Sequence, residues 1–221
     1  MPRMARLVVP GYPHHVTQRG SRKQTIFFGD TDYRAYIELI CRLKEEAAVD
    51  IWAYCLMPNH VHLVAVPDNK QGLAKLFGVA HHRYARRINA QNDWCGHLWQ
   101  ERFHSFVMDE SHLLAAVRYI ELNPVRAGFC RHADQWKWSS VHAHLSRNSD
   151  KLVNATPMNA LVSDWGHYLA DELRADDIEI LRRHTRTGRP AGSRDFIEKI
   201  EVLSGRHLQR RKPGPKAGLL R

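Results

Sequence analysis

Two apolar runs joined by a Pro-Asn pair constrain the fold of this chain more than any other feature of its sequence. Residues 51–57 and 60–66 are rich in apolar side chains, and Pro67 closes the second run. Pro58 and Asn59, which separate the runs, are residue types typical of turns. Strands joined by so short a connection pair as an antiparallel hairpin. The sequence therefore predicts a sheet built around this hairpin.

Further elements are expected on both sides of the hairpin. Strands are predicted at residues 15–18 and 103–107, and helices at 31–48, at 73–89 and from Asp109 or Ser111 to Asn123. The last helix is expected to stop there because the residue before Pro124 avoids helical geometry. The first six elements of this β-α-β-β-α-β-α order match the split βαβ, ferredoxin-like pattern. The predicted fold class is α+β, an antiparallel sheet with helices on one face and a helical C-terminal extension.

The C-terminal part of the chain is less regular. Helices are predicted over residues 136–145, 171–183 and 193–204. We expect a main domain at residues 1–145, a helical extension at 146–205 and a basic tail at 206–221. Because the tail has no apolar periodicity, we expect it to be disordered when free.

The charge of the chain favours a nucleic-acid partner. The 221 residues carry a formal net charge of +10, and a basic chain without a membrane anchor most often meets nucleic acid. A solvated basic surface is the alternative. Beyond Glu201 the sequence has no acidic residue, and its basic residues there are Arg206, Arg210, Arg211, Lys212, Lys216 and Arg221.

The compartment predicted from the sequence is the bacterial cytoplasm, at the nucleoid when DNA is bound. No apolar run approaches the length of a membrane span, and the N-terminus lacks the pattern of a secretory signal. The four cysteines are scattered and form no Cys-x-x-Cys pair, which argues against a zinc ribbon and a disulfide scaffold.

His60 and His62 are the first candidates for chemistry. Side chains alternate along a strand, so both imidazoles are expected on one face, with Val61 and Leu63 on the other. Two nitrogens at this spacing suit a single metal ion. The alternative is a pair of half-buried histidines held by ordinary hydrogen bonds.

The third predicted helix supplies two more candidates. Tyr119 and Asn123 are four residues apart and therefore share a helix face. Ala115, one turn below, is expected to leave the phenol room to stand clear, and Asn123 could offer a carbonyl oxygen to a metal. Alternatively, Tyr119 is an aromatic at the edge of the core and Asn123 is a helix C-cap.

Taken together, these motifs resemble the REP-associated tyrosine transposases, relatives of the single-strand insertion-sequence transposases within the HUH (His-hydrophobic-His) nuclease class. The segments that carry the resemblance are HHVTQRG, YCLMPNHVHLVAVP, WQERFHSFV, VRYIELNPVRAG and WKWSS, from His15 to about Ser140. A looser match follows in TGRPAGSRDFIEKIEVLSGR. The motifs show no departure from the family's pattern.

The resemblance implies that residues 1–145 are a catalytic domain. It implies Tyr119 as the nucleophile and a divalent metal, Mg²⁺ or Mn²⁺, on His60, His62 and Asn123. The implied substrate is single-stranded DNA with a REP-type hairpin, cleaved and rejoined through a 5′-phosphotyrosine. A monomer is expected rather than a dimer.

The expected DNA contacts are basic. The candidates are Arg19, Arg22, Lys23, Arg83, Arg86, Arg87, Arg102, Arg118, Arg126, Arg210, Arg211 and Lys212. Each could equally be a solvated charge, and only clustering near the catalytic face would favour a role in binding.

Three alternatives stay open at this point. The chain could be a non-catalytic DNA-binding regulator of hairpin elements on the same scaffold. It could be a metal-dependent hydrolase that activates water in place of tyrosine. It could also be an RNA-binding module, although its predicted strands lack the aromatic signature of that class.

Overall fold

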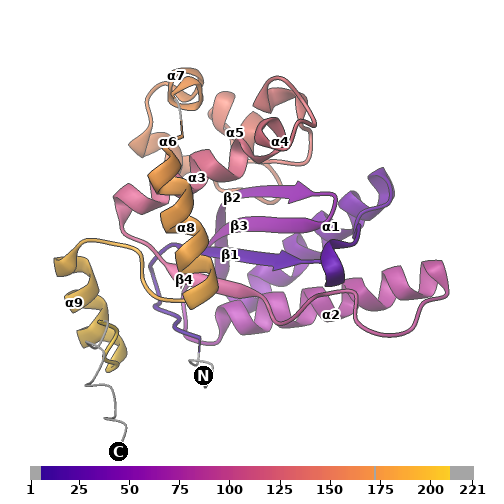
Figure 1. The fold of residues 1–221 in the computed structure, drawn as a ribbon, viewed down its shortest axis with the longest axis horizontal. Helices are drawn as coiled ribbons and strands as arrows, with labels where there is room; N and C mark the ends of the chain where they lie inside the picture. The colour runs from indigo at the N-terminus through magenta and orange to yellow at the C-terminus, as the bar shows by residue number, and fades with distance from the viewer. Residues whose placement is uncertain (1–5, 172, 210–221) are drawn as a thin grey trace, which may run out of the picture.

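The fold is built on the predicted sheet. The structure is a computed structural model that describes residues 6–171 and 173–209. Its four strands are β1 (His14–Arg19), β2 (Val49–Met57), β3 (His60–Pro67) and β4 (His104–Val107), in the order β2-β3-β1-β4. Every neighbouring pair is antiparallel (Figure 1), and Thr17 and Cys55 flank His62 in the register. This confirms the ferredoxin-like arrangement, with the hairpin strand β3 inside the sheet.

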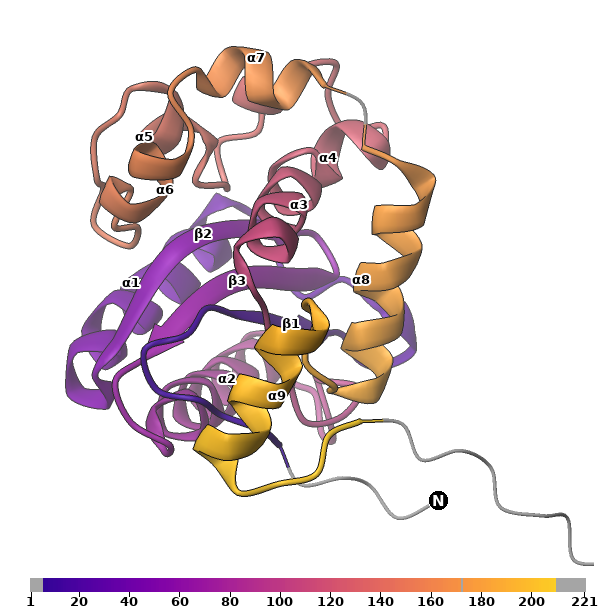
Figure 2. The ribbon, with the colours of Figure 1, turned by 90° about the vertical axis from the view of Figure 1, so that its left-hand side faces the viewer.

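One face of the sheet is closed by the two long helices of the predicted unit, α1 (Asp30–Ala47) and α2 (Gly72–Asn92) (Figure 2). Their apolar stripes meet inward-pointing residues of β1 and β3 in one continuous core. Its members include Val16, Leu63, Tyr36, Leu76 and Phe77, each fully buried. This face carries the larger apolar core of the fold.

The opposite face is covered by α3 (Glu110–Glu121) and by α8 (Ala175–Thr187). Val64 and Phe106 of the sheet, Ile120 of α3 and Leu181 of α8 belong to one buried cluster. Trp165 of α7 (Trp165–Ala170) joins the same cluster. The C-terminal extension therefore packs on the sheet itself.

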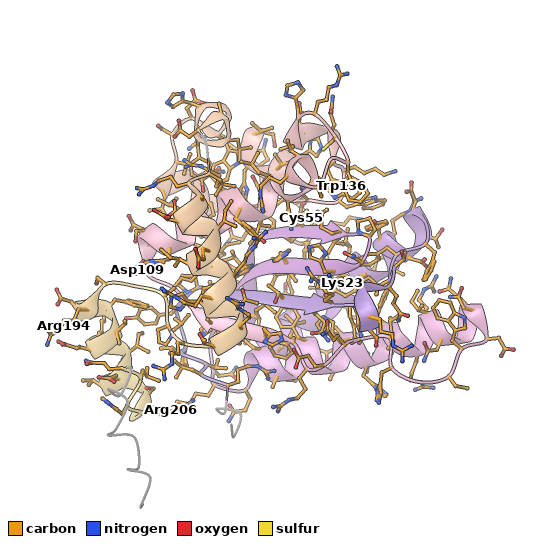
Figure 3. All side chains as sticks on the ribbon, in the orientation of Figure 1. Lys23, Cys55, Asp109, Trp136, Arg194 and Arg206 are labelled. Carbon is orange, nitrogen blue, oxygen red and sulfur yellow. The ribbon has the colours of Figure 1, made fainter. Side chains whose placement is uncertain are left out.

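Backbone hydrogen bonds fasten the segment after α8 to the end of β4. The amide of Ala191 donates to the Val107 carbonyl at 2.9 Å, and the Asp109 amide donates to the Ala191 carbonyl at 3.0 Å. The Asp109 carboxylate accepts from the amides of His112 and Ser193. Asp109 thus caps α3 and holds the start of α9 (Arg194–Ser204), and Figure 3 shows it beside that junction.

Short elements complete the chain and differ most from expectation. They are 3₁₀ turns at Ser21–Lys23 and Ala133–Gln135, and helices α4 (Asn123–Arg126), α5 (Val141–Leu145) and α6 (Thr156–Leu161). The helix predicted over 136–145 is thereby reduced to α5, and the one predicted over 171–183 is displaced to α8, which Gly188 ends in a left-handed conformation. Helices α6 and α7, six residues each, were not predicted, because two turns are too short to show a periodicity.

Two other expectations concern the basic C-terminal tail and the absence of a membrane-spanning helix. Leu208, in the segment predicted as a free tail, is buried beside Ile200 of α9, whereas Arg210, Arg211 and Lys212 lie outside the described residues. Within the described part of the chain, no helix is both long enough and apolar enough to cross a membrane.

Candidate active site

The two histidines of the hairpin share one face of β3, as their spacing predicted. Their ring centroids are 4.9 Å apart, and the rings stand edge to face. His62 is buried and His60 half-buried. Val61 and Leu63 point to the other face and are fully buried in the α1–α2 core. The alternation of one strand therefore fixes both imidazoles toward the face covered by α3 and α8.

Asn59 determines which nitrogen of His60 is available. Its side-chain oxygen lies 2.6 Å from His60 Nδ1. Because a carbonyl oxygen can only accept, Nδ1 must carry the proton, and the lone pair of the neutral ring is then on Nε2. His60 Nε2 lies 3.3 Å from the Nδ2 of Asn123. A half-turn of that amide would bring its oxygen to the same place.

His15 plays the equivalent part for His62. His15 Nε2 lies 3.0 Å from His62 Nδ1, and the two rings stack with centroids 5.2 Å apart. If His62 donates from Nδ1, its Nε2 is free and His15 carries its proton on Nδ1. That nitrogen is buried and has no hydrogen-bond partner among the described residues. A metal-ligating histidine usually has such a second partner on its other nitrogen.

Burial keeps these imidazoles neutral. It lowers the pKa of His60 to about 3, with Arg19 adding to the effect. It also lowers the pKa of His15 to about 3 and that of His62 well below its ordinary value. Removing a charged ring from water is unfavourable, so the neutral form dominates. Neutral imidazole is the form that binds metal ions.

Tyr119 faces this pair from α3. Its ring centroid lies 5.7 Å from that of His62 and 6.5 Å from that of His15. The guanidinium of Arg126 lies over the phenol ring, 4.4 Å from its centroid. The side chain is only 9% exposed. The phenol therefore does not stand clear as expected, because Arg126 lies over it, but it does lie beside the imidazoles.

A buried carboxylate fixes the helix that carries Tyr119. Glu121, fully buried, accepts from Ser140 Oγ at 2.5 Å, lies 2.6 Å from His144 Nδ1, and accepts from Trp165 Nε1 at 2.8 Å. These three partners belong to the turn before α5, to α5 and to α7. The end of α3 is thereby fastened to the C-terminal part of the chain.

Asn123 reaches His60 in a way that simple helical spacing does not describe. Helix α3 ends at Glu121, and Asn123 begins α4, where Pro124 occupies the first turn. Proline is tolerated there because the first amides of a helix have no intrahelical partner. The side chain is 7% exposed and faces His60, as the hydrogen bond shows.

The site opens into a cavity of about 850 Å³ between the sheet and α8. His15, His60, His62 and Tyr119 line its floor. Its charged walls carry four arginines and a single glutamate, namely Arg19, Arg126, Arg182, Arg186 and Glu179. Such a balance suits an anionic ligand.

The donor set limits the metal that the site could hold. Across the described residues, no three His, Cys, Asp or Glu side chains are grouped as a metal site. The available groups are His60 Nε2, His62 Nε2 and, after rotation, the amide oxygen of Asn123. Two ring nitrogens and an amide oxygen fit the divalent ion that the resemblance implies.

The predicted DNA contacts are only partly brought together. Arg19 and Arg126 line the cavity. Arg22, Lys23 and Arg102 are exposed outside its lining, and Figure 3 shows Lys23 at the end of the sheet away from Asp109. Arg118 pairs with Asp171 at 3.3 Å and lies over Tyr168.

Three further candidates lie on the other side of the sheet. Arg83, Arg86 and Arg87 are on α2, whose core face packs against the side of the sheet away from the cavity. Tyr84 of the same helix is buried, and its hydroxyl donates to the Ile26 carbonyl at 2.7 Å. Tyr84 is therefore a core residue and is not available to stack on a base.

Sequence reasoning missed four residues of the site. His15 and Asn59 lie within segments that carry the resemblance. Only Asn59 had an available signal, because it is a polar residue next to the proposed ligand His60. Arg182 and Arg186 lie one turn apart on α8, and nothing in the sequence indicated that this helix would reach the sheet.

Comparison with known proteins places the chain. The family model described as "Transposase IS200 like" matches residues 9–123. A "REP-associated tyrosine transposase" of Escherichia coli (strain K12) is 22% identical over 133 residues, which cover 60% of this chain and 76% of the relative. A relative from Haemophilus influenzae is 28% identical over 101 residues, covering 41% of this chain and 57% of its own.

A solved structure shares the fold. It is described as "Structure of the REP associates tyrosine transposase bound to a REP hairpin". The superposition has a TM-score of 0.55 at 19% identity and covers 70% of this chain and 92% of the other. About 30% of this chain therefore has no counterpart in that structure.

Proposed function

This chain belongs to the IS200-like transposase family, and from that premise we propose that it cuts and rejoins single-stranded DNA with the Tyr119 hydroxyl as nucleophile. One observation carries the proposal. The Tyr119 phenol lies beside the His60–His62 pair on the floor of one basic cavity. A phosphate bound there would meet the nucleophile and the two imidazoles together.

A phosphodiester resists nucleophilic attack because its charged oxygens repel nucleophiles. Arg19 and Arg126 supply positive charge in the cavity. The Tyr119 oxygen forms a bond to phosphorus as the bond from phosphorus to the 3′ oxygen breaks. The phenol loses its proton, and the departing oxygen gains one. The products are a 5′-phosphotyrosine and a free 3′-hydroxyl.

The covalent intermediate accounts for rejoining. The phosphotyrosine keeps one phosphodiester bond for each one broken, so a 3′-hydroxyl can attack it and release Tyr119. Strand transfer therefore needs no external energy source. A water-activating hydrolase would leave no such adduct.

We propose that His60, His62 and Asn123 hold Mg²⁺ or Mn²⁺. When bound, such an ion neutralises charge on a non-bridging phosphate oxygen. Asn59 keeps the proton of His60 on Nδ1, and the contact with His15 does the same for His62 when His62 is the donor, so that each Nε2 has a lone pair for the ion. An amide as third ligand favours these ions over zinc, whose catalytic sites usually have three ligands of the His, Glu or Cys type.

The proposed substrate is a single strand that flanks a DNA hairpin of the REP type. The E. coli relative is named for its association with REP elements, and the solved structure carries a REP hairpin. One copy of this chain brings Tyr119, His60 and His62 together, which supports a monomer. The bacterial cytoplasm stays the predicted compartment.

The direct test uses end-labelled hairpin oligonucleotides with single-stranded flanks, incubated with the protein and Mg²⁺ or Mn²⁺. We expect a protein–DNA adduct on a denaturing gel, with the DNA located on Tyr119 by mass spectrometry. Tyr119→Phe should abolish the adduct and retain hairpin binding. Tyr12→Phe is the matched control, because Tyr12 packs against Phe196 outside the cavity.

Two results would count against the proposal. An adduct that persists in Tyr119→Phe would show that another group is the nucleophile. Binding without cleavage by the unaltered chain, in either metal, would favour the non-catalytic regulator of hairpin elements.

A further inference from the structure

Helix α8 lies across the catalytic face, and no feature of the proposed chemistry uses it. Its residues that line the cavity are spaced as one helical face: Ala175, Ile178, Glu179, Leu181, Arg182, Thr185 and Arg186. Leu181 is buried in the cluster that includes Phe106 and Ile120, so the helix is packed onto the sheet and α3. The cavity therefore has a fixed outer wall.

The position of this wall is set at its C-terminal end. The ring of His184 packs against Phe106 of β4, with centroids 5.7 Å apart. Gly188 ends the helix, and Ala191 then pairs with the backbone after β4. The site residues of the floor and the arginines of the wall thus face the same space from elements far apart in the sequence.

The wall is basic where it faces the site. Arg182 and Arg186 are exposed, and among the described residues neither forms an ion pair with a carboxylate. Glu179 is the single acidic residue in the lining. These two arginines of α8 share the cavity lining with Arg19 of β1 and Arg126 of α4, so three elements contribute positive charge to it. Repeated positive charge along a groove suits the backbone of a nucleic acid.

The size of the cavity suits a short stretch of a single strand. A volume of about 850 Å³ lies within the usual range of small-ligand sites. A cavity of this size has room for a few nucleotides of one strand. The floor holds the proposed nucleophile, so the bound strand would be the one that is cut.

We propose that α8 is the outer wall of a channel for the scissile strand, and that Arg182 and Arg186 bind backbone phosphates adjoining the one that faces Tyr119. The proposal rests on the proposed function for the identity of the strand. It adds a second phosphate-binding surface, contributed by the C-terminal extension. The wall would hold the strand against the floor during cleavage and rejoining.

The test measures binding rather than cleavage. All variants are made in the Tyr119→Phe background, and the affinity for a fluorescent single-stranded oligonucleotide is measured without metal at several salt concentrations. We expect Arg182→Ala and Arg186→Ala each to weaken binding roughly tenfold, the scale of one charge-assisted hydrogen bond. The double variant should lower the slope of log affinity against log salt by about 1.4, because each single-strand phosphate contact contributes about 0.7.

Arg183→Ala is the matched control. Arg183 is an exposed arginine of the same helix that does not line the cavity. The affinity of Arg183→Ala should lie within about twofold of the parent, and its salt slope within about 0.3, because a surface charge that does not contact the strand has only a small effect. Arg182→Lys should restore part of the affinity. Thermal unfolding should be unchanged in every variant, because these side chains are exposed.

Three outcomes would overturn the channel. Equal losses in Arg183→Ala would mean that general charge explains the effect. Unchanged affinity in the double variant would mean that the wall does not touch DNA. Tighter binding would mean that α8 obstructs the site. Because no cleavage is needed, a failure of the tyrosine chemistry would not mimic any of these results.

Discussion

The same strands make both faces of the sheet, but one face is an apolar core and the other lines the cavity of the candidate site. On one face Val16, Val61 and Leu63 are fully buried against α1 and α2. On the other, shifted by a single residue, His15 and His62 lie over a cavity. Alternation along a strand thus separates the residues that stabilise the fold from those proposed to do chemistry. Substitutions at neighbouring residues of one strand are therefore expected to affect stability in one case and chemistry in the other.

The largest expected effect comes from substituting His62 and Leu63, adjacent residues of β3 whose side chains lie on opposite faces of the sheet. His62→Ala should reduce adduct formation roughly a hundredfold or more, since charge neutralisation by a metal contributes several kcal/mol to such reactions. Leu63→Ala should instead lower the free energy of unfolding by about 2–5 kcal/mol. Adduct assays and urea unfolding measure the two.

The comparison fails if the effects are not separable. A Leu63→Ala protein that is folded yet inactive would contradict it. So would a His62→Ala protein destabilised as much as the Leu63 variant.

A smaller effect is expected from His15, which contacts His62 on the catalytic face. His15→Ala should weaken Mn²⁺ binding by about 10–100-fold, because it removes the group that orients His62. Isothermal titration of the protein with Mn²⁺ measures this without DNA. The neighbouring His14→Ala is the control: His14 bonds to the backbone of Val9 and Tyr12, so it should cost stability and leave Mn²⁺ affinity unchanged. Equal Mn²⁺ affinities in the two variants would exclude His15 from the site.

The smallest effect concerns a histidine of the core face. Burial lowers the pKa of His81 to about 3, and its ring nitrogen lies 2.9 Å from the Tyr36 hydroxyl. His81 therefore binds a proton near pH 6.5 in the unfolded chain, whereas in the folded chain it stays neutral until the pH approaches 3. The contribution of the neutral His81 ring to the free energy of unfolding is complete above pH 6.5 and is lost as the pH falls toward 3.

His81→Gln should remove one such proton from the pH dependence. Between pH 7 and pH 5.5, the variant should lose about 1 kcal/mol less unfolding free energy than the parent. Urea unfolding at both pH values measures the difference. Identical pH dependence in the two proteins would show that His81 titrates normally when folded.

The fold of the first two-thirds was predictable because its signals are local. The apolar runs on either side of Pro58-Asn59 predicted the hairpin, and the stripes of α1 and α2 were long enough to show a helical period. The extension was harder. Its α6 and α7 have six residues each, and they are positioned by contacts such as that of Trp165 with Glu121.

The candidate site divides in the same way. His60 and His62 were paired correctly because strand geometry alone puts them on one face. Tyr119 and Asn123 were linked by helical spacing, yet the structure ends α3 at Glu121 and places Asn123 in α4. His15 could not be paired with His62 from the sequence, because their contact depends on the β1–β3 register.

By itself, the sequence determined the order of the elements up to α3, the hairpin and the face on which its imidazoles lie, since each depends on interactions between residues close along the chain. Only the tertiary structure decided that His15 would meet His62, that Arg126 would lie over Tyr119, and that α8 would close the cavity. These contacts join distant segments. Their geometry is set by strand register and by the packing of many side chains at once, and no local pattern in a sequence records it.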